Sequence, residues 1–248
     1  MQSEIQKFDF QKGEVLVFDK PLDWTSFDLV HRVRYMICKK LNIKKLKVGH
    51  AGTLDPKATG ILVLCTGKAT SGIETIQAEE KEYVATLKFG ATTPSYDLES
   101  DEDRQFDTSH ISKGLLVEVL KKFTGAIEQI PPGYSAIKIE GKRAYEYARK
   151  GITVEIKPKI VKIKEIEVLN FSLPEVKLRI VCGKGTYIRA LARDIGEALC
   201  SGAYLTGLRR TRVGGYSLNQ AIELADFLKP QQNITNKNLV SSDILISA

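Results

Sequence analysis

The sequence has few of the residues that bind metal ions. Its 248 residues include three histidines and four cysteines, and the cysteines stand singly, with no C-x-x-C pair (Cys38, Cys65, Cys182 and Cys200). Zinc sites usually place paired ligands within a few residues of one another, so no structural or catalytic metal is expected. Single cysteines within apolar patterns are typical of buried thiols in a reducing compartment.

Long apolar runs and nucleotide-binding motifs are also missing. No stretch approaches the ~20 apolar residues that span a bilayer. The first ten residues, MQSEIQKFDF, are polar where a signal peptide would be basic and then apolar. We therefore expect a cytoplasmic protein with no membrane partner. Neither GxxxxGK[ST] nor a strand-linked GxGxxG occurs, which leaves nucleotide hydrolysis and dinucleotide binding without their main support.

Positive charge is in excess and gathers in two places. The chain has 37 Lys and Arg against 30 Asp and Glu, a net charge of +7, which favours polyanionic partners. The two clusters are Lys39, Lys40, Lys44, Lys45 and Lys47, and Arg209, Arg210 and Arg212. A solvated face is the simpler explanation for each cluster. Only their convergence in space would create a phosphate-binding surface.

The densest pattern is the segment 48–60, VGHAGTLDPKATG. Its three glycines permit backbone angles and close approaches that other residues do not. Pro56 restricts its own φ and pushes Asp55 towards an extended conformation. Such a shaped loop suits a carboxylate that is presented to a ligand. The alternative is an Asx-type turn in which Asp55 caps the local backbone and His50 only packs.

Periodicity predicts a mixture of strands and helices without a regular βαβ alternation. Strands are expected over 14–18, 61–66, 81–90 and 175–183, with one long or two shorter strands over 154–171 and a strand or hairpin over 203–218. Helices are expected after Thr25 or Ser26, over 69–77, from residues 108–109 to 123, over 143–150, from 188 to 199, and over 218–228. This order favours an α+β fold with a mixed, largely antiparallel central sheet, flanking helices and an active-site cleft. One domain over 1–228 and a short tail over 229–248 are expected.

Three features could cooperate in chemistry: Asp55, Tyr83 at the start of a strand, and the segment KGTYIR at Lys184–Arg189. Glycines at a helix N-terminus, together with Lys184 and Arg189, could bind an anion. Arg189 beside Asp55 would favour the charged carboxylate, which suits a nucleophile better than a general acid. Tyr83 and Tyr187 are either amphipathic residues at the edge of the core or rings that flank a flipped nucleobase.

Five ordered blocks together resemble the TruB family of tRNA pseudouridine synthases. They are KP with WTS near residue 20, GHAGTLDPKATG at 49–60, KEYVA at 81–85, PPGYSAIKIEGKRAYEYARKG at 131–151 and GKGTYIRALARDIG at 183–196. The resemblance runs from about residue 15 to about residue 228. It implies the pseudouridine synthase fold and isomerisation of the uridine at position 55 of the tRNA T-loop, without metal or cofactor.

The resemblance also implies roles for individual residues. Asp55 would be the catalytic aspartate, Tyr83 would stack on the flipped base, and Arg189 would pair with Asp55. The further substrate-binding positions would be His50, Tyr187, Lys20, Tyr134, Lys138, Lys184 and Leu208. Whether Asp55 attacks C1′, attacks the uracil ring or assists elimination stays open. A base must leave its stack before a carboxylate can reach its glycosidic bond, and RNA loops are where this costs least.

Two departures and two rival hypotheses accompany the resemblance. Many family members carry a C-terminal RNA-binding PUA domain, which is not expected here, so the two basic clusters would hold more of the T-arm stem-loop. In the acidic segment after residue 90, Asp97 is the polar contact expected to remain.

A monomer without guide RNA is expected. The rivals are a guide-RNA-dependent, dyskerin-like enzyme and an RNA-binding protein or tRNA chaperone in which the aspartate loop is purely structural.

Overall fold

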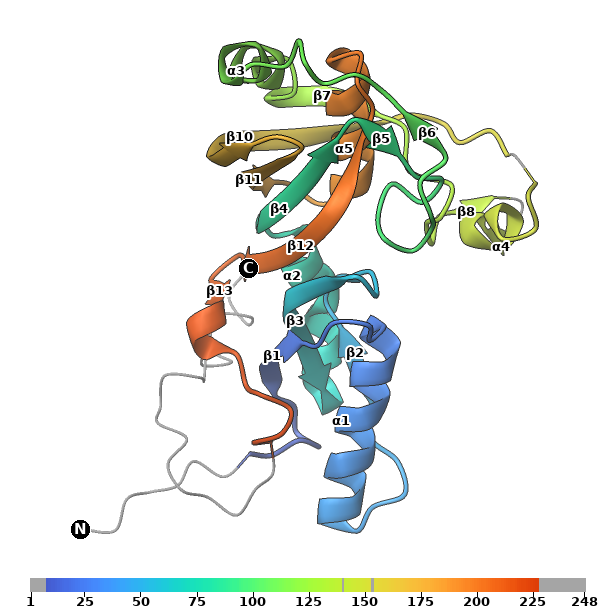
Figure 1. Cartoon of the computed structure of the whole chain (residues 1–248). Helices are drawn as coiled ribbons and strands as arrows, with labels where there is room; N and C mark the ends of the chain where they lie inside the picture. Colours follow the sequence, from blue (N-terminus) through green and yellow to red (C-terminus); the bar gives the residue numbers. More distant parts are fainter. Residues whose placement is uncertain (1–7, 140, 153, 228–248) are drawn as a thin grey trace. The chain divides into compact units, whose positions relative to one another are not determined.

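The computed structural model describes residues 8–139, 141–152 and 154–227 (Figure 1). The chain forms two compact units: the first is Met1–Glu79 with Arg210–Ala248, and the second is Glu80–Arg209. Strand β12 (Ala203–Val213) contributes residues to both. The single domain expected over 1–228 stays a prediction, and the tail expected over 229–248 lies outside the described residues.

The first unit is built around the long strand β3 (Ala58–Thr66). β1 (Val15–Lys20) and β2 (Val48–His50) both pair with β3 in antiparallel orientation. The register of β1 places Lys20 opposite Gly60. Helix α1 (Ser26–Leu41) lies beside these strands, and the 3₁₀ turn Gly67–Gly72 and α2 (Ile73–Ala78) follow β3 (Figure 1). Two loops of this unit, 21–25 and 51–57, therefore start from strands whose register is fully specified.

Both faces of these strands are buried. Leu16, Leu62 and Leu64 belong to an apolar cluster with the inner face of α1. Their neighbours along the strands, among them Val17 and Val63, form a second cluster with Ile76 and Val213. Because successive side chains of a strand point to opposite faces, a strand that is covered on both sides reads as a continuous apolar run. This explains the uninterrupted ILVLC sequence of β3.

Helix α1 begins and ends with well-formed caps. The side chain of Thr25 accepts a hydrogen bond from the Asp28 amide, the Asp28 carboxylate accepts one from the Thr25 amide, and Asn42 adopts a left-handed conformation that ends the helix. Val30, Val33 and Ile37 are buried as their spacing predicts. Phe27 and Leu41 have the same spacing of three and four residues but are 66% and 41% exposed. The buried face is therefore narrower than the sequence pattern indicated.

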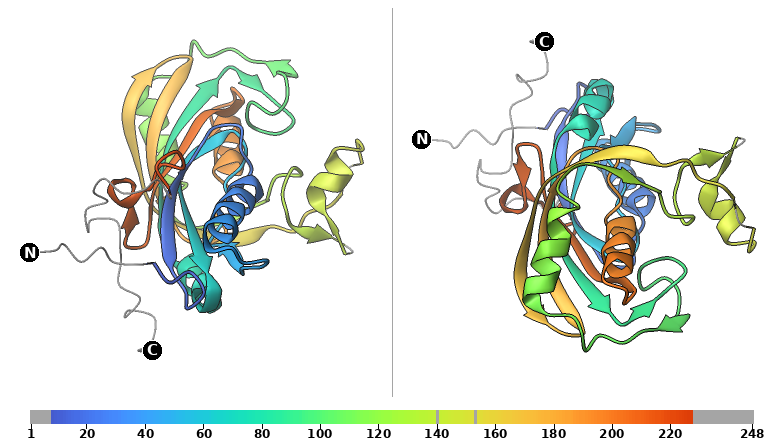
Figure 2. Two further views of the ribbon diagram at one scale, coloured as in Figure 1. Left: turned by 90° about the horizontal axis from the view of Figure 1, so that it is seen from below. Right: turned by 90° about the horizontal axis from the view of Figure 1, so that it is seen from above.

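The second unit contains a sheet in which β4 (Lys81–Phe89), β11 (Glu175–Cys182), β10 (Lys159–Ser172) and β7 (Gly125–Gln129) follow one another with antiparallel pairing. Helices α3 (Lys113–Lys121) and α5 (Ile188–Ala198) contact each other. α3 also contacts β10 and α5 contacts β4 (Figure 2). Small antiparallel pairs, β5 (Ala91–Thr92) with β6 (Arg104–Gln105) and β8 (Lys138–Ile139) with β9 (Lys142–Arg143), and the short helix α4 (Ala144–Ala148) complete it.

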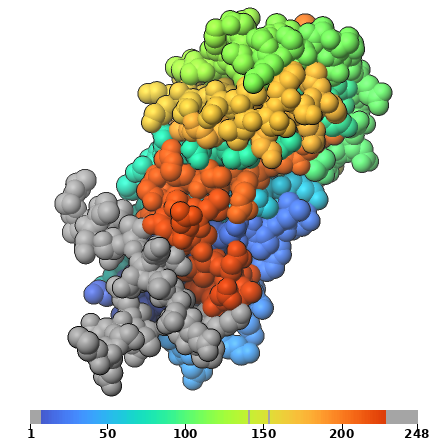
Figure 3. Space-filling view, turned by 60° about the vertical axis from the view of Figure 1, so that its left-hand side comes forward, coloured from blue at the N-terminus to red at the C-terminus, as the bar shows by residue number. Residues whose placement is uncertain are grey.

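One face of this sheet is solvated and carries charge. Arg179 on β11 forms ion pairs with Glu82 on β4 and with Glu165 and Glu167 on β10. Most β10 side chains are exposed, and they form part of the gold surface in Figure 3. The opposite, buried face of β4 carries Tyr83 and every second residue after it, as the alternation predicts. The second unit thus has an inner face that can hold Tyr83 firmly.

Several boundaries differ from those expected. The expected helix over 218–228 is wrong within the described residues, where only a 3₁₀ turn at Leu218–Gln220 forms (η2). α3 is capped by Ser112 rather than by Thr108 or Ser109. Residues 203–217 form the expected hairpin of β12 and β13 (Tyr216–Ser217). Two of the four cysteines expected to be buried are not, since Cys38 is half-buried and Cys200 exposed. No helix among the described residues is long and apolar enough to cross a membrane.

Candidate active site

The loop between β2 and β3 presents Asp55 half-exposed and fixes the backbone on both sides of it. The Ser26 hydroxyl lies 2.8 Å from the Leu54 nitrogen and 3.0 Å from the Leu54 carbonyl oxygen, so it bonds the residue before Asp55. The Asp23 amide donates to the carbonyl of Pro56, the residue after Asp55, at 2.9 Å. The carbonyl of Asp55 itself accepts from the Ala58 amide at 3.0 Å. The loop is therefore built to hold one orientation of the Asp55 backbone.

Lys20, expected on the RNA-facing surface, is instead completely buried beneath this loop. Its ammonium donates to the carbonyls of Pro21 and Trp24, at 2.8 and 2.6 Å, and to that of Pro56 at 3.4 Å. Burial lowers the pKa of Lys20 from 10.5 to about 8, while the negative charge of Asp55 acts in the opposite direction. Lys20 thus joins the start of α1 to the Asp55 loop and places a cation within electrostatic reach of its carboxylate.

Arg210, a residue of β12, bonds the backbone at the beginning of the Asp55 loop. It is 1% exposed, and its guanidinium donates to the carbonyls of Ile61 at 2.8 Å, Gly52 at 3.0 Å and Thr53 at 3.4 Å. A phosphate-binding role, expected for the cluster around it, is therefore wrong for this arginine. Gly60 allows the approach: its φ is +99°, and an added Cβ would lie 2.2 Å from the Arg210 carbonyl oxygen.

His50 is the last residue of β2 and lies two residues before Gly52, whose carbonyl accepts a hydrogen bond from Arg210. It is half-buried, and burial together with the positive charge of Arg210 lowers its pKa. The imidazole is therefore neutral at pH 7, when it can donate one hydrogen bond and accept another. A neutral ring at this place can take part in hydrogen bonds but contributes no positive charge to the loop.

In the second unit, Arg189 occupies the first turn of α5 and is 4% exposed. Its guanidinium donates to the carbonyls of Ser95 at 3.1 Å and Tyr134 at 2.9 Å, and its Nε lies 3.5 Å from the Asp97 carboxylate. Asp97 is 3% exposed. Arg189 therefore connects two chain segments far apart in sequence, and its pairing with Asp55 stays a prediction.

Arg193, one turn further along α5, supports the same two segments, a role that the sequence did not predict. Its guanidinium donates to the carbonyl of Ile130 at 3.0 Å and lies 5.1 Å from the centre of the Tyr96 ring, within cation–π range. Tyr96 has a left-handed backbone with φ of 61°. The spacing of the two arginines, four residues apart on one helix, was the only available signal for this shared role.

The turn that leads into α5 holds Tyr187 by its backbone. The Tyr187 amide donates to the side-chain oxygen of Gln129 at 2.8 Å, and the Gln129 side-chain nitrogen donates to the Tyr187 carbonyl at 3.2 Å. Gln129 is 1% exposed. Lys184 is exposed in the same turn. An anion site was expected at this end of the helix. The Arg189 guanidinium and the Tyr187 amide already bond other protein groups, so Lys184 is the exposed charge that remains there among the described residues.

The other predicted substrate-binding residues lie at separate places in the second unit. Tyr83 is 8% exposed on β4, opposite Ile180 of β11. Tyr134 is half-buried and contributes its carbonyl to Arg189. Lys138 is exposed on β8, and Leu208 is half-buried on β12. Among the described residues, no group of three or more His, Cys, Asp or Glu side chains is placed to hold a metal ion.

Comparison with known sequences gives a consistent result over nearly the whole chain. Residues 39–188 match the family described as TruB family pseudouridylate synthase (N terminal domain), and residues 189–244 match the tRNA pseudouridylate synthase B C-terminal domain. The chain is 61% identical over 219 residues to tRNA pseudouridine synthase B of Phocaeicola vulgatus, covering 88% of this chain and 93% of that one. It is 50% identical over 220 residues to the protein of the same name from Flavobacterium johnsoniae, covering 88% and 96%.

Solved structures share the fold. The chain in the structure titled "Crystal Structure of a Cbf5-Nop10-Gar1 Complex" aligns with a TM-score of 0.65 and 32% identity, covering 88% of this chain. The chain spans about half, 54%, of that longer protein. A second Cbf5 structure, of the archaeal box H/ACA sRNP Nop10-Cbf5 complex, aligns at a TM-score of 0.62 and 28% identity. The α+β fold with a mostly antiparallel sheet is thereby confirmed, and the chain belongs to the TruB family of pseudouridylate synthases.

Proposed function

We propose that this chain converts uridine to pseudouridine in tRNA, at position 55 of the T-loop, with Asp55 as the catalytic residue. The observation that carries the proposal is the Asp55 loop. Asp55 itself is half-exposed, while Ser26, Asp23, Lys20 and Arg210 fix the backbone around it. Preorganisation of this kind is what a catalytic group requires. Membership of the TruB family, and relatives named tRNA pseudouridine synthase B, support tRNA as the substrate.

The proposed reaction is an isomerisation with balanced bonds and protons. The bond between N1 of uracil and C1′ of ribose breaks, the base turns, and a bond forms between C5 and C1′. C5 loses a proton and N1 gains one, so the nucleotide keeps its composition and no redox partner is needed. Asp55 acts at C1′, at the uracil ring, or as the group that assists elimination at the ribose.

The second unit would hold the flipped base. Tyr83 would stack on the uracil ring and Tyr187 would line the pocket, its backbone oriented by Gln129. Arg189 would pair with Asp55, and His50 would help to hold the extruded loop. Lys184, Lys138, Tyr134 and Leu208 would contact the surrounding RNA. Lys20 would act through the Asp55 loop, because its ammonium is buried against carbonyls.

The experiment is tritium release from a tRNA transcript labelled with 5-³H-uridine, incubated without guide RNA, metal or cofactor. We expect release by the wild-type protein and none by Asp55→Asn, which should still bind the transcript. Mapping of the product by carbodiimide modification and primer extension should place pseudouridine at position 55. Release that requires an added guide RNA would favour the guide-dependent alternative. Equal release by Asp55→Asn would remove Asp55 from the mechanism.

A tRNA chaperone is the second candidate, favoured by the many structural contacts of the Asp55 loop. Under that hypothesis, the loop would only stabilise the fold, and Asp55→Asn would leave every function unchanged. No tritium release by either protein, with tRNA still bound, would select it.

A further inference from the structure

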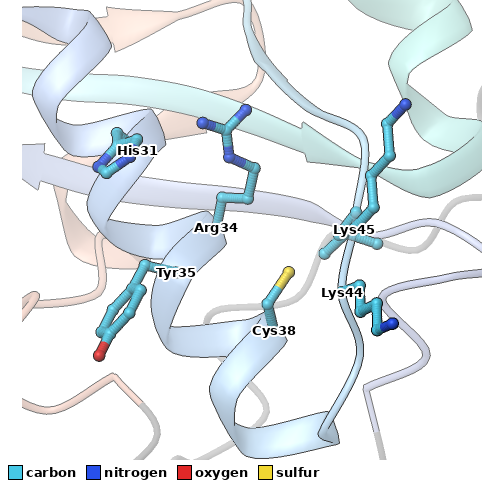
Figure 4. Close-up of a pocket in the computed structure, with 7 residues that line it drawn as sticks. His31, Arg34, Tyr35, Cys38, Lys44 and Lys45 are labelled. Atoms are coloured by element: carbon cyan, nitrogen blue, oxygen red, sulfur yellow. The ribbon is translucent and has the colours of Figure 1, made fainter.

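A pocket on the first unit lies between helix α1 and the segment 44–46, at the edge of the apolar cluster that contains Leu46. It has a volume of about 340 Å³ and is lined by His31, Arg34, Tyr35, Cys38, Lys44, Lys45 and Leu46. Figure 4 shows Cys38 pointing from α1 into the space beside the segment that carries Lys44 and Lys45, with Arg34 one turn further up the helix. The volume is at the low end of the ~300–1,000 Å³ typical of small-molecule sites, and it is large enough for part of a nucleotide.

The pocket is strongly cationic and has no acidic lining residue. Arg34, Lys44 and Lys45 contribute three positive charges. Within residues 8–139, 141–152 and 154–227, no ion pair involves any of the three. The nearest carboxylate on the helix, Asp28, is engaged by the Thr25 amide and hydroxyl. Three cations around one hollow favour an anion with several oxygens, such as a phosphodiester.

The same face of α1 exposes aromatic rings. Phe27, His31 and Tyr35 follow one another at intervals of four residues, and the rings of Phe27 and His31 stack with centroids 6.3 Å apart. Phe27 and Tyr35 are 66% and 52% exposed. Aromatic rings beside a cationic groove are the combination that binds a nucleic-acid strand, because rings accept bases while cations follow the backbone.

The position of this face relates it to Asp55. Ser26, the first residue of α1, bonds the backbone of Leu54. Arg34 lies eight residues further along the helix, about 12 Å at ~1.5 Å per residue. A stacked strand advances ~3.4 Å per nucleotide, so about four nucleotides cover that distance. About four stacked nucleotides therefore span the length of α1 from Ser26, which bonds the Asp55 loop, to Arg34 in the pocket.

We propose that the pocket binds a backbone phosphate of the substrate RNA, within about four nucleotides of the reacting uridine, while the aromatic face of α1 contacts the intervening strand. The ligand class is a phosphodiester of RNA. The inference rests on the proposed function, because it assumes that the target uridine sits at Asp55. It assigns a binding role to Arg34, names a backbone phosphate as the group that Lys44 and Lys45 contact, and explains why Phe27 is left exposed.

The first test couples one side chain to one phosphate. A T-arm hairpin is synthesised with single methylphosphonate linkages at each position within five nucleotides of the target. Affinities are measured with Asp55→Asn protein, so that no turnover occurs. The variants are Arg34→Gln and, as matched control, Arg32→Gln, an exposed arginine on the same helix that does not line the pocket.

We expect Arg34→Gln to weaken hairpin binding roughly threefold to tenfold and to lower the salt slope by ~0.7–1, the loss of one phosphate contact. Arg32→Gln should change affinity less than twofold. A methylphosphonate at one linkage should weaken hairpin binding to the Asp55→Asn protein. The same linkage should not weaken binding further when Arg34→Gln is also present, and this identifies the phosphate that Arg34 contacts. Equal affinity of Arg34→Gln and Arg32→Gln, or additive effects at every linkage, would overturn the proposal and favour an acidic protein as occupant.

A second test reads the pocket directly through Cys38, which is half-buried in its wall. Alkylation of Cys38 by excess N-ethylmaleimide is followed by mass spectrometry, with and without saturating hairpin. We expect the RNA to slow the reaction at least fivefold, and an unchanged rate would contradict the proposal. Tritium release by wild-type protein is measured in parallel, so that a failure of the proposed reaction is seen separately from a failure of the pocket.

Discussion

Arg210 and Gly52 are joined by a hydrogen bond of 3.0 Å from the guanidinium Nη2 to the carbonyl oxygen, three residues before Asp55. The same guanidinium bonds the carbonyl of Ile61 on β3, which is fully buried. One side chain therefore ties the candidate catalytic loop to the core of the first unit. This relationship makes stability and activity depend on the same residue.

The first prediction concerns Arg210→Met, which keeps the length of the chain but removes all five donors. The buried carbonyl of Ile61 would lose its bond, and the Gly52 end of the loop would be released. We expect the free energy of unfolding to fall by about 2–4 kcal/mol, measured by urea denaturation. Tritium release should fall at least tenfold at a temperature where the variant is folded, while tRNA affinity changes little. Arg209→Met, on the neighbouring half-exposed position, is the control.

A second prediction tests the close approach at Gly60. Gly60 and Gly125 have nearly the same φ, +99° and +101°, but an added Cβ meets the Arg210 backbone only at Gly60. Both alanine variants carry the strain of a left-handed conformation, about 1–2 kcal/mol. Gly60→Ala should lose several kcal/mol more, or fail to fold. Equal melting temperatures for the two variants would show that the contact with Arg210 relaxes without cost.

The third prediction follows from the lowered pKa of Lys20. Its folded-state pKa is about 8 against 10.5 when exposed, so the unfolded chain binds the proton more tightly. Protonation therefore opposes folding below pH 8, and this cost disappears as the pH rises from about 8 to 10.5. The stability of the wild type relative to Lys20→Met should rise across that window by about 3 kcal/mol. A difference that is flat over pH 7–10.5 would contradict the shift.

The fourth prediction separates binding from chemistry at Arg189. Arg189→Ala leaves the carboxylate of Asp97 buried without its cation, which typically costs about 3–5 kcal/mol. Arg189→Lys keeps the positive charge beside Asp97, so its free energy of unfolding should be higher than that of Arg189→Ala. In both variants, turnover should fall far more than tRNA affinity. A large loss of affinity with normal turnover would make Arg189 a phosphate contact only. Arg104→Ala, at an exposed position of the same unit, should change neither quantity.

A fifth prediction addresses Gln129, which bonds both backbone groups of Tyr187. Gln129→Glu keeps the oxygen that accepts from the Tyr187 amide but replaces the nitrogen that donates to its carbonyl. If Tyr187 lines the base pocket, turnover should drop about tenfold with a smaller effect on affinity. Gln129→Leu, which removes both bonds, should lower stability by roughly 1–3 kcal/mol as well. Unchanged turnover in both variants would remove Tyr187 from the proposed pocket.

Patterns along the chain predicted most strands because burial on one or both faces leaves a direct record in the sequence. β4 alternates and β3 contains the apolar run ILVLC, and both strands were predicted, although β3 begins three residues earlier than expected. The expected helix after residue 218 failed for a related reason: Ile222 instead bridges to Phe18 on β1, and Phe227 packs against Phe18 in the core. Tertiary contacts decided the conformation of a segment whose apolar spacing also fits a helix.

The burial of three positively charged side chains could not be predicted from the sequence. Lys20, Arg189 and Arg210 are charged residues that default to the surface. Each is buried here because carbonyl oxygens from distant segments converge on it: Pro56 on Lys20, Ser95 on Arg189 and Ile61 on Arg210. Such convergence depends on the completed fold. The glycines around Asp55 indicated a shaped loop, but nothing in the local sequence indicated which side chains would shape it.

The bonds that surround Asp55 have a consequence for hydrogen exchange. Loop amides usually exchange through small local openings. Here, the amides of Ala51, Leu54 and Ala58 donate to Val63, Ser26 and Asp55 respectively, and the first two of those partners belong to β3 and α1. Deuterium should therefore enter this loop almost as slowly as it enters β3. The amide hydrogens of the candidate catalytic segment would then exchange on the same timescale as those of the core.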